Sequence, residues 1–287
     1  QRCHQQPMPG REVAEHDQQG EHDDHGEQQR VELLDHHRQR QTGEYADDHQ
    51  IAGAVLETVE QVFDTDFAAI VKHGINTMYG ADPKDVFYYI TLYNENYPMP
   101  GLKAGTEEQI LKGMYLLSPA GDGDGPRAQI LASGVSVPWA LAAQQKLREE
   151  WGVFADVWSV TSWNELRRDG LDVDRYNLLH PNAEPRTAYV TARLGGQPGP
   201  VIAVSDFMRA VQDQIQPWVP NDFVSLGTDG WGMSDTRGAL RRHFLVDAES
   251  ITVQTLAQLA KRGEFDRGRV AEAVARYQLD DASAADA

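Results

Sequence analysis

The 287-residue chain has a single cysteine, Cys3, and no apolar run long enough to cross a membrane. One thiol excludes a disulfide framework and any zinc or iron–sulfur site that needs several cysteines. The first residues form no charged-then-apolar leader, so we expect no secretory signal. These absences predict a cytoplasmic protein with no membrane partner.

Basic residues are also scarce, because 26 Lys and Arg stand against 44 Asp and Glu and leave a formal net charge of -18. Binding to a nucleic-acid backbone requires clustered Lys and Arg. The sequence therefore predicts no nucleic-acid partner.

Apolar residues are rare in residues 1–50, which contain only nine of them and seven of the ten histidines. Such a segment buries too little surface to offset its ordering entropy, so we expect disorder. The histidines favour a solvated polar tail over a metal-binding tract, because no ligand spacing recurs. A third interpretation is an aberrant low-complexity stretch from a misread or out-of-frame gene start.

The rest of the chain alternates helical and strand patterns, which predicts an α/β fold with a mostly parallel sheet and helices on both faces. A helix is expected over 51–79 with a break near 63–65, and a helix-to-strand passage over 106–117. Ser136, Ser162, Asp235 and Asp247 are expected to cap helices. Further strands are expected at 129–133, 156–160, 200–204 and 222–226, and further helices at 206–218 and 267–278.

Residues 86–93 (VFYYITLY) are a continuous β-branched and aromatic run, which predicts a strand buried on both faces. The Asn94-Glu95 pair follows directly, and ligands bind at the carboxyl ends of strands in open α/β sheets. Glu95 is therefore the best-placed acid in the chain, and Asn94 and Glu95 are candidate cleft residues.

Common catalytic motifs are absent from the sequence, including G-x-S-x-G and the P-loop. Residues 121–126 (GDGDGP) begin like a calcium loop, but Ser133 stands where the final Glu is needed, so a connector is favoured. Residues 227–232 favour a tight turn over a phosphate loop, and Asp229 and Asp235 favour turn or capping roles.

Two histidines after residue 50, His180 and His243, are candidates for a functional role. His180 lies in a loop before a proline and is a candidate cleft residue, although hydrogen bonding at the edge of the core is favoured. His243 follows two arginines near a helix end, where the dipole favours cations, so a structural role is favoured.

Several blocks resemble, in order and spacing, the homodimeric bacterial-type pyruvate dehydrogenase E1 component, a transketolase-like family. The strand and loop 86–97 carry the resemblance first. The other blocks are 130–134 (ILASG), 156–170 (DVWSVTSWNELRRDG), 178–181 (LLHP), 204–209 (VSDFMR), 226–237 (LGTDGWGMSDTR), and 243–244 (HF) with 246–248 (VDA).

The resemblance implies a domain plan in which residues 51–120 end the pyrimidine-binding middle domain and 121–280 form a transketolase C-terminal-like domain. Residues 281–287 form a frayed tail. It implies thiamine diphosphate and magnesium as cofactors, a homodimer, and the E2 acetyltransferase as partner. The reaction implied is the oxidative decarboxylation of pyruvate with acyl transfer to the lipoyl group of E2.

The family's cofactor-binding signature and its histidine-bearing stretch have no counterpart in this sequence. We therefore expect a piece of the enzyme that is inactive alone, with Asn94, Glu95 and His180 as candidate cleft residues and with no cofactor-binding or metal residue identified. The alternative is a non-catalytic α/β module that dimerises or binds a ligand at its strand ends.

Overall fold

The computed structural model describes residues 66–93, 101–102 and 104–281. Its five described strands are β1 (Met114–Ser118), β2 (Arg127–Ala132), β3 (Phe154–Val160), β4 (Val201–Val204) and β5 (Phe223–Leu226). They form one sheet in the order β1-β3-β2-β4-β5, in which β1 is antiparallel and all other pairs are parallel. The prediction of a mostly parallel α/β sheet is confirmed.

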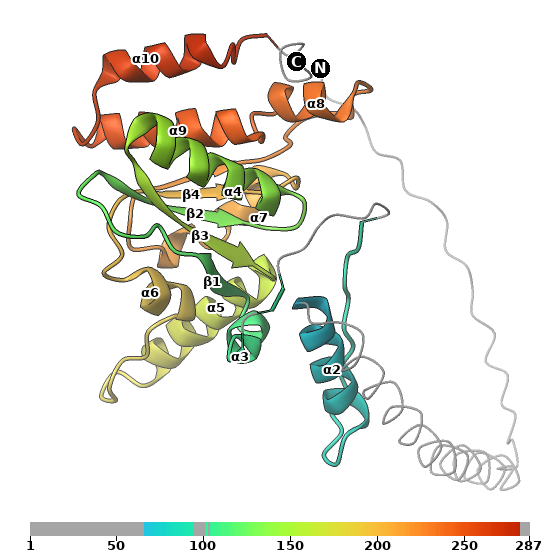
Figure 1. Ribbon diagram of the computed structural model, residues 1–287. Helices are drawn as coiled ribbons and strands as arrows, with labels where there is room; N and C mark the ends of the chain where they lie inside the picture. The colour runs from blue at the N-terminus through green and yellow to red at the C-terminus, as the bar shows by residue number, and fades with distance from the viewer. Residues whose placement is uncertain (1–65, 94–100, 103, 282–287) are drawn as a thin grey trace, which may run out of the picture. The chain divides into compact units, whose positions relative to one another are not determined.

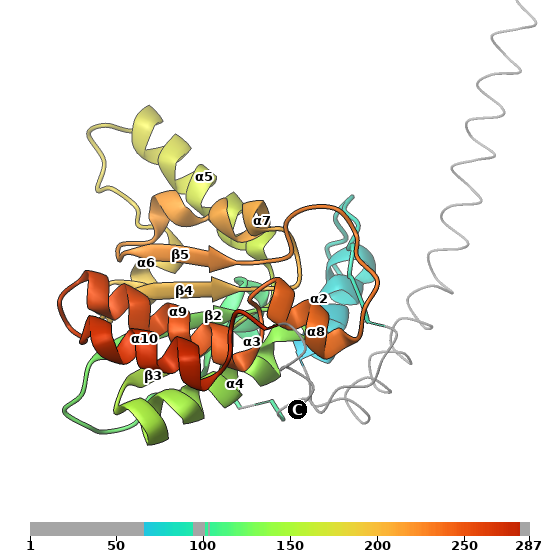
Figure 2. The same cartoon turned by 90° about the horizontal axis from the view of Figure 1, so that it is seen from above.

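The sheet is apolar because helices cover both of its faces (Figures 1 and 2). Side chains of Ile130 and Ile202 point to a cluster with α4 and α9, while those of Leu131 and Ala203 point to a second cluster on the opposite face. All four side chains are fully buried. This two-sided burial explains why β4 (VIAV) reads as a continuous apolar run.

Each face has its own helices. On one face α4 (Ser136–Lys146), continued by the π-helical turn η1 (Leu147–Trp151), packs beside α9 (Ala248–Lys261), and α10 (Arg267–Arg276) packs on α9. On the other face lie α5 (Trp163–Leu179), α6 (Tyr189–Leu194), α7 (Arg209–Asp213) and the 3₁₀ turn η2 (Gln216–Trp218). The remaining described helices are α2 (Asp66–Tyr79), α3 (Glu107–Leu111) and α8 (Arg237–His243).

Two of the four predicted helix caps are confirmed. Ser162 accepts a hydrogen bond from the backbone N–H of Glu165 at 3.1 Å, and Asp247 accepts one from that of Ser250 at 2.8 Å. The predicted cap at Asp235 was wrong, because Thr236 caps α8 and Asp235 accepts the N–H of Thr236 instead. The predicted cap at Ser136 was also wrong, because Ser136 is the buried first residue of α4 and lies inside the helix.

Arg242 is a buried cation that joins three helices. Its guanidinium bonds the carboxylate of Asp247 at 2.5 Å and the carbonyl of Tyr277 at 2.8 Å, and it lies 3.4 Å from Glu249. Arg242 belongs to α8, Asp247 caps α9, and Tyr277 follows α10 directly. A charge with only 4% of its side chain exposed is tolerated because the ion pair and the carbonyl satisfy it.

The prediction of a doubly buried strand at 86–93 was wrong. This segment follows α2, and none of the described strands pairs with it. Phe87 is 86% exposed and Tyr89 is 85% exposed, whereas Tyr88 lies against Gly74 of α2 and hydrogen-bonds His73 at 2.6 Å. Apolar, β-branched composition makes a buried strand only where neighbouring strands and helices supply partners.

The helices on either side of β4 in the sequence also differ from expectation. The helix predicted over 206–218 is two short pieces, α7 and η2, and α6 was not predicted. The boundaries expected for α2 and for the elements of 106–117, 156–160 and 222–226 agree with the structure to within a few residues. Residues 1–65 and the tail 282–287 lie outside the described residues, so the expected disorder and fraying stay predictions, as do the domain boundaries.

Candidate functional site

The candidate site lies at the carboxyl edge of the sheet, between β2 and β4. The chain leaves β2 toward α4 on one face and leaves β4 toward α7 on the other. Such a divergence is the topological switch point at which open α/β sheets bind ligands. We define the switch point here by the residues that follow the two strands: Ser133 and Gly134, Ser205 and Asp206.

Two buried serines fix the floor of the switch point. Their hydroxyl oxygens lie 2.9 Å apart, and the indole N–H of Trp163 donates to Ser133 Oγ at 3.0 Å. Ser205 Oγ also accepts the N–H of Phe207 at 3.2 Å. The partners of the two hydroxyls are each other, an indole N–H and a backbone N–H, and none of these is a general base, so the floor carries no activated nucleophile.

A tyrosine from a distant part of the chain reaches the switch point. Tyr93 donates its phenolic hydrogen to Asp206 Oδ1 at 2.7 Å. The carbonyl of Asp206 is itself fixed, because Thr228 Oγ1 donates to it at 2.6 Å. The sequence prediction had Asp206 at the start of a helix, whereas in the structure its carboxylate receives Tyr93.

The turn after β5 borders the same edge and is fixed by an ion pair. Asp229 accepts the backbone N–H of Arg209 at 2.9 Å and its guanidinium at 2.6 Å, so it holds the first turn of α7 from 20 residues away. The hydrogen bond from Arg209 lowers the pKa of this exposed carboxyl. The predicted structural role of Asp229 is confirmed, and Gly230 in this turn has a φ of +108°.

A second carboxylate lies against the strands at the outer part of this edge. Asp66, the first residue of α2, accepts hydrogen bonds from Tyr115 Oη at 3.0 and 3.1 Å and from Ser159 Oγ at 3.4 Å. Burial raises the pKa of Asp66 in spite of these bonds, and burial together with the charge of Asp66 raises that of Tyr115. Its partners are one hydroxyl of β1 and one of β3, so the cluster anchors α2 to these two strands.

The grouping of the sequence-predicted cleft residues Asn94, Glu95 and His180 stays a prediction. Asn94 and Glu95 lie outside the described residues, although Tyr93, which precedes them, lies at the carboxyl edge. His180 is the C-cap of α5, which starts at that edge and runs for 17 residues, so His180 lies about 25 Å away. Its ring stacks on Tyr176 at 4.4 Å and hydrogen-bonds the carbonyl of Tyr176, which supports a structural role.

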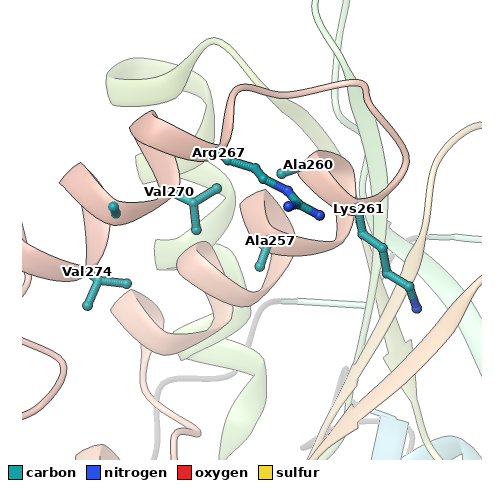
Figure 3. Close-up of a pocket in the computed structure, with 7 residues that line it drawn as sticks. Ala257, Ala260, Lys261, Arg267, Val270 and Val274 are labelled. Atoms are coloured by element: carbon teal, nitrogen blue, oxygen red, sulfur yellow. The ribbon is translucent and has the colours of Figure 1, made fainter.

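A groove between α9 and α10 is a second concave surface of the chain (Figure 3). Its lining is mostly alanine and valine, with two cations at its rim, Lys261 and Arg267. Neither an acid nor a nucleophile lines it, so it offers no chemistry. The residues are Ala257, Ala260, Lys261, Arg267, Val270, Ala271 and Val274.

Within 66–93, 101–102 and 104–281, no cluster of three His, Cys, Asp or Glu side chains could hold a metal ion. In the same ranges no helix is both long and apolar enough to cross a membrane. Thiamine diphosphate is held through a metal with oxygen ligands, and the described residues do not fit that group.

Sequence reasoning missed Tyr93, Ser133 and Ser205. A signal was present, since Ser-Gly and Ser-Asp directly follow two apolar strands at 133–134 and 205–206. That signal could be used only with the strand order, which places β2 beside β4 even though β3 lies between them in sequence.

Comparison with known proteins gives one family and a set of close relatives. Residues 113–247 match the transketolase-like C-terminal domain family. The chain is 48% identical over 252 residues to the pyruvate dehydrogenase E1 component of Mycolicibacterium smegmatis and 46% identical over 252 residues to that of Mycobacterium tuberculosis. Each alignment covers 85% of this chain and 27% of the relative.

A more distant relative agrees. The pyruvate dehydrogenase E1 component of Escherichia coli K12 is 43% identical over 214 residues, which cover 74% of this chain and 24% of that protein. The chain thus spans about a quarter of the length of the curated relatives that it matches. The resemblance found in the sequence is confirmed.

Proposed function

Because this chain contains a transketolase-like C-terminal domain and is homologous to the C-terminal part of pyruvate dehydrogenase E1 components, we propose that it serves as that part of such an enzyme. The observation that carries the proposal is the 48% identity over 252 residues, which extends well beyond the 113–247 domain. In the assembled enzyme the reaction would be the oxidative decarboxylation of pyruvate, with transfer of the acyl group to the lipoyl arm of E2.

The described residues support a structural contribution to that reaction. Most apolar side chains of the sheet are buried, as are Ser133 and Ser205, and the carboxyl edge holds paired groups without a metal cluster among the described residues. Such an edge can shape a cleft and exclude water, which a cofactor enzyme requires of its protein. We therefore propose that this chain alone neither binds thiamine diphosphate with magnesium nor turns over pyruvate.

The assembly partners follow from the same proposal. A second copy of the subunit and the E2 acetyltransferase are the expected protein partners. Thiamine diphosphate and magnesium would be bound by parts of the subunit that the described residues do not supply. The proposed compartment is the cytoplasm, which agrees with the single cysteine.

A chimera tests the proposal directly. Residues 66–281 of this chain replace the aligned quarter of the M. smegmatis enzyme, and pyruvate oxidation is measured with an artificial electron acceptor, thiamine diphosphate and magnesium. We expect the chimera to be active and the M. smegmatis protein without that quarter to be inactive. Calorimetric titration of this chain alone with thiamine diphosphate and magnesium should give no heat of binding.

Two outcomes contradict the proposal. A folded chimera that binds thiamine diphosphate but does not oxidise pyruvate would show that this domain cannot replace its relative. Pyruvate turnover by this chain alone would show that it carries a complete site.

A further inference from the structure

The segment 86–93 is attached at its last residue to the sheet that follows it in the sequence. Its last residue, Tyr93, lies 113 positions before its hydrogen-bond acceptor Asp206. The contact joins a segment that lies outside the 113–247 match to the switch point inside that match. Neither the family match nor the reaction assigns a role to this contact.

The geometry at Gly134 shows how closely the phenol fits. A β-carbon at Gly134 would lie 2.5 Å from Tyr93 Oη and 2.9 Å from Tyr93 Cε2, which is too close for real carbon contacts. Gly134 also has a φ of +56°. Glycine is therefore required at this turn for two reasons, the backbone conformation and the approach of the tyrosine.

The backbone around the acceptor, Asp206, is held by contacts that do not involve Tyr93. Asp206 follows fully buried Ser205, whose hydroxyl bonds Ser133, and the Asp206 carbonyl is held by Thr228. An acceptor fixed in this way loses little entropy when it receives a donor, and the bond is charge-assisted.

A second polar attachment holds the other end of the same element. Asp66, at the start of α2, is bonded by Tyr115 and Ser159 of β1 and β3. Between the two attachments Tyr88 packs on Gly74 and bonds His73, so α2 and 86–93 form one element. The two attachments lie on different strands of the sheet, β1 with β3 at one end and the β2–β4 switch point at the other.

We propose that the phenol of Tyr93 is the built-in occupant of the switch point and acts as a latch that sets the position of α2 and 86–93 on the sheet. The edge at which open α/β sheets receive a ligand is used here for an internal tyrosine. Tyr93 and Asp206 are positioning residues in this arrangement. The latch requires no cofactor or substrate, so it can hold or fail independently of the proposed enzyme function.

Spin-label distances measure the latch in this chain without further components. Nitroxide labels are placed at Lys84→Cys and Lys261→Cys, both on exposed residues, in a Cys3→Ser background. We expect a single narrow distance distribution. Tyr93→Phe keeps the ring and deletes the hydroxyl, and should lower the ratio of docked to undocked molecules about 2- to 12-fold, which corresponds to one hydrogen bond.

Gly134→Ala tests the fit of the ring and should release the segment further than Tyr93→Phe, because it displaces both the ring and its hydroxyl. Gly152→Ala is the matched control, since Gly152 has a φ of +67° but no neighbouring atom within 4 Å. It carries a similar backbone strain without the collision. Tyr89→Phe, at an 85% exposed position of the same segment, is the control for loss of a hydroxyl.

The outcomes separate clearly. Broadening with Tyr93→Phe and Gly134→Ala, but not with either control, supports the latch. A broad distribution in the parent chain overturns it, as does a distribution that neither Tyr93→Phe nor Gly134→Ala changes. Circular dichroism shows whether the sheet stays folded in each variant, and if Gly134→Ala unfolds it, Tyr93→Phe alone decides.

Discussion

Strand β4 and the segment 86–93 have similar apolar, β-branched sequences and opposite environments. All four residues of β4 are fully buried between two layers of helices, whereas Phe87 is 86% exposed and Tyr89 is 85% exposed. β4 has β2 on one side and β5 on the other, while no described strand lies beside 86–93. The comparison shows that partners, and not composition alone, decide whether such a run becomes a buried strand.

The same comparison explains which parts of the fold the sequence could predict. Strands β2 to β5 were predictable because each is a short apolar run followed by a helical pattern, and the Ser162 capping box marked the start of α5. The environment of 86–93 was not predictable, because the amino-acid sequence of a segment does not show whether a neighbouring strand is present to pair with it. The site was harder still, since the contact between Tyr93 and Asp206 depends on strand order and on 113 intervening residues.

The largest expected effect contrasts the two runs directly. Ile202→Ala removes a fully buried side chain between two helix layers and should lower the free energy of unfolding by about 2–5 kcal/mol. Phe87→Ala, at an 86% exposed position, should change it by less than about 0.5 kcal/mol. Denaturant unfolding followed by circular dichroism measures both. Equal losses would show that 86–93 is buried in solution.

A smaller effect is expected at the start of α5. Ser162→Ala deletes the side-chain oxygen that accepts the N–H of Glu165, and should lower the free energy of unfolding by about 1 kcal/mol. Ser234→Ala, on an exposed residue outside the helices, serves as the control and should have almost no effect. A loss no greater than that of the control would mean that solvent caps this helix equally well.

The smallest effect concerns pH and the attachment of α2. The pKa of Asp66 is raised by burial above 3.8, so the folded chain binds a proton more tightly than the unfolded chain does. Stability should therefore fall as pH rises from about 3.8 through the raised value. Asp66→Asn removes this group, so the difference in unfolding free energy between parent and variant isolates its contribution. That difference should shift against the parent between pH 4 and pH 7.

A difference that stays constant over this range would place Asp66 in water, where its pKa is ordinary. A shift of opposite sign would show that the bonds from Tyr115 and Ser159 outweigh burial. The first result would remove Asp66 as a buried anchor of α2 and leave Tyr93 as the attachment to test, whereas the second would keep Asp66 as an anchor in its charged form.

The buried guanidinium of Arg242 has a consequence for how the C-terminal helices come apart. It holds the cap of α9 and the carbonyl that follows α10 at once, while Trp151 donates its indole N–H to Tyr277 Oη at 2.9 Å. Opening any one of the three helices breaks a bond of this cation and leaves the Arg242 guanidinium with fewer partners in the interior. Hydrogen exchange in α8, α9 and α10 should therefore proceed through one shared opening event. Truncation after Arg276 should release all three helices together, although it removes no residue from any of them.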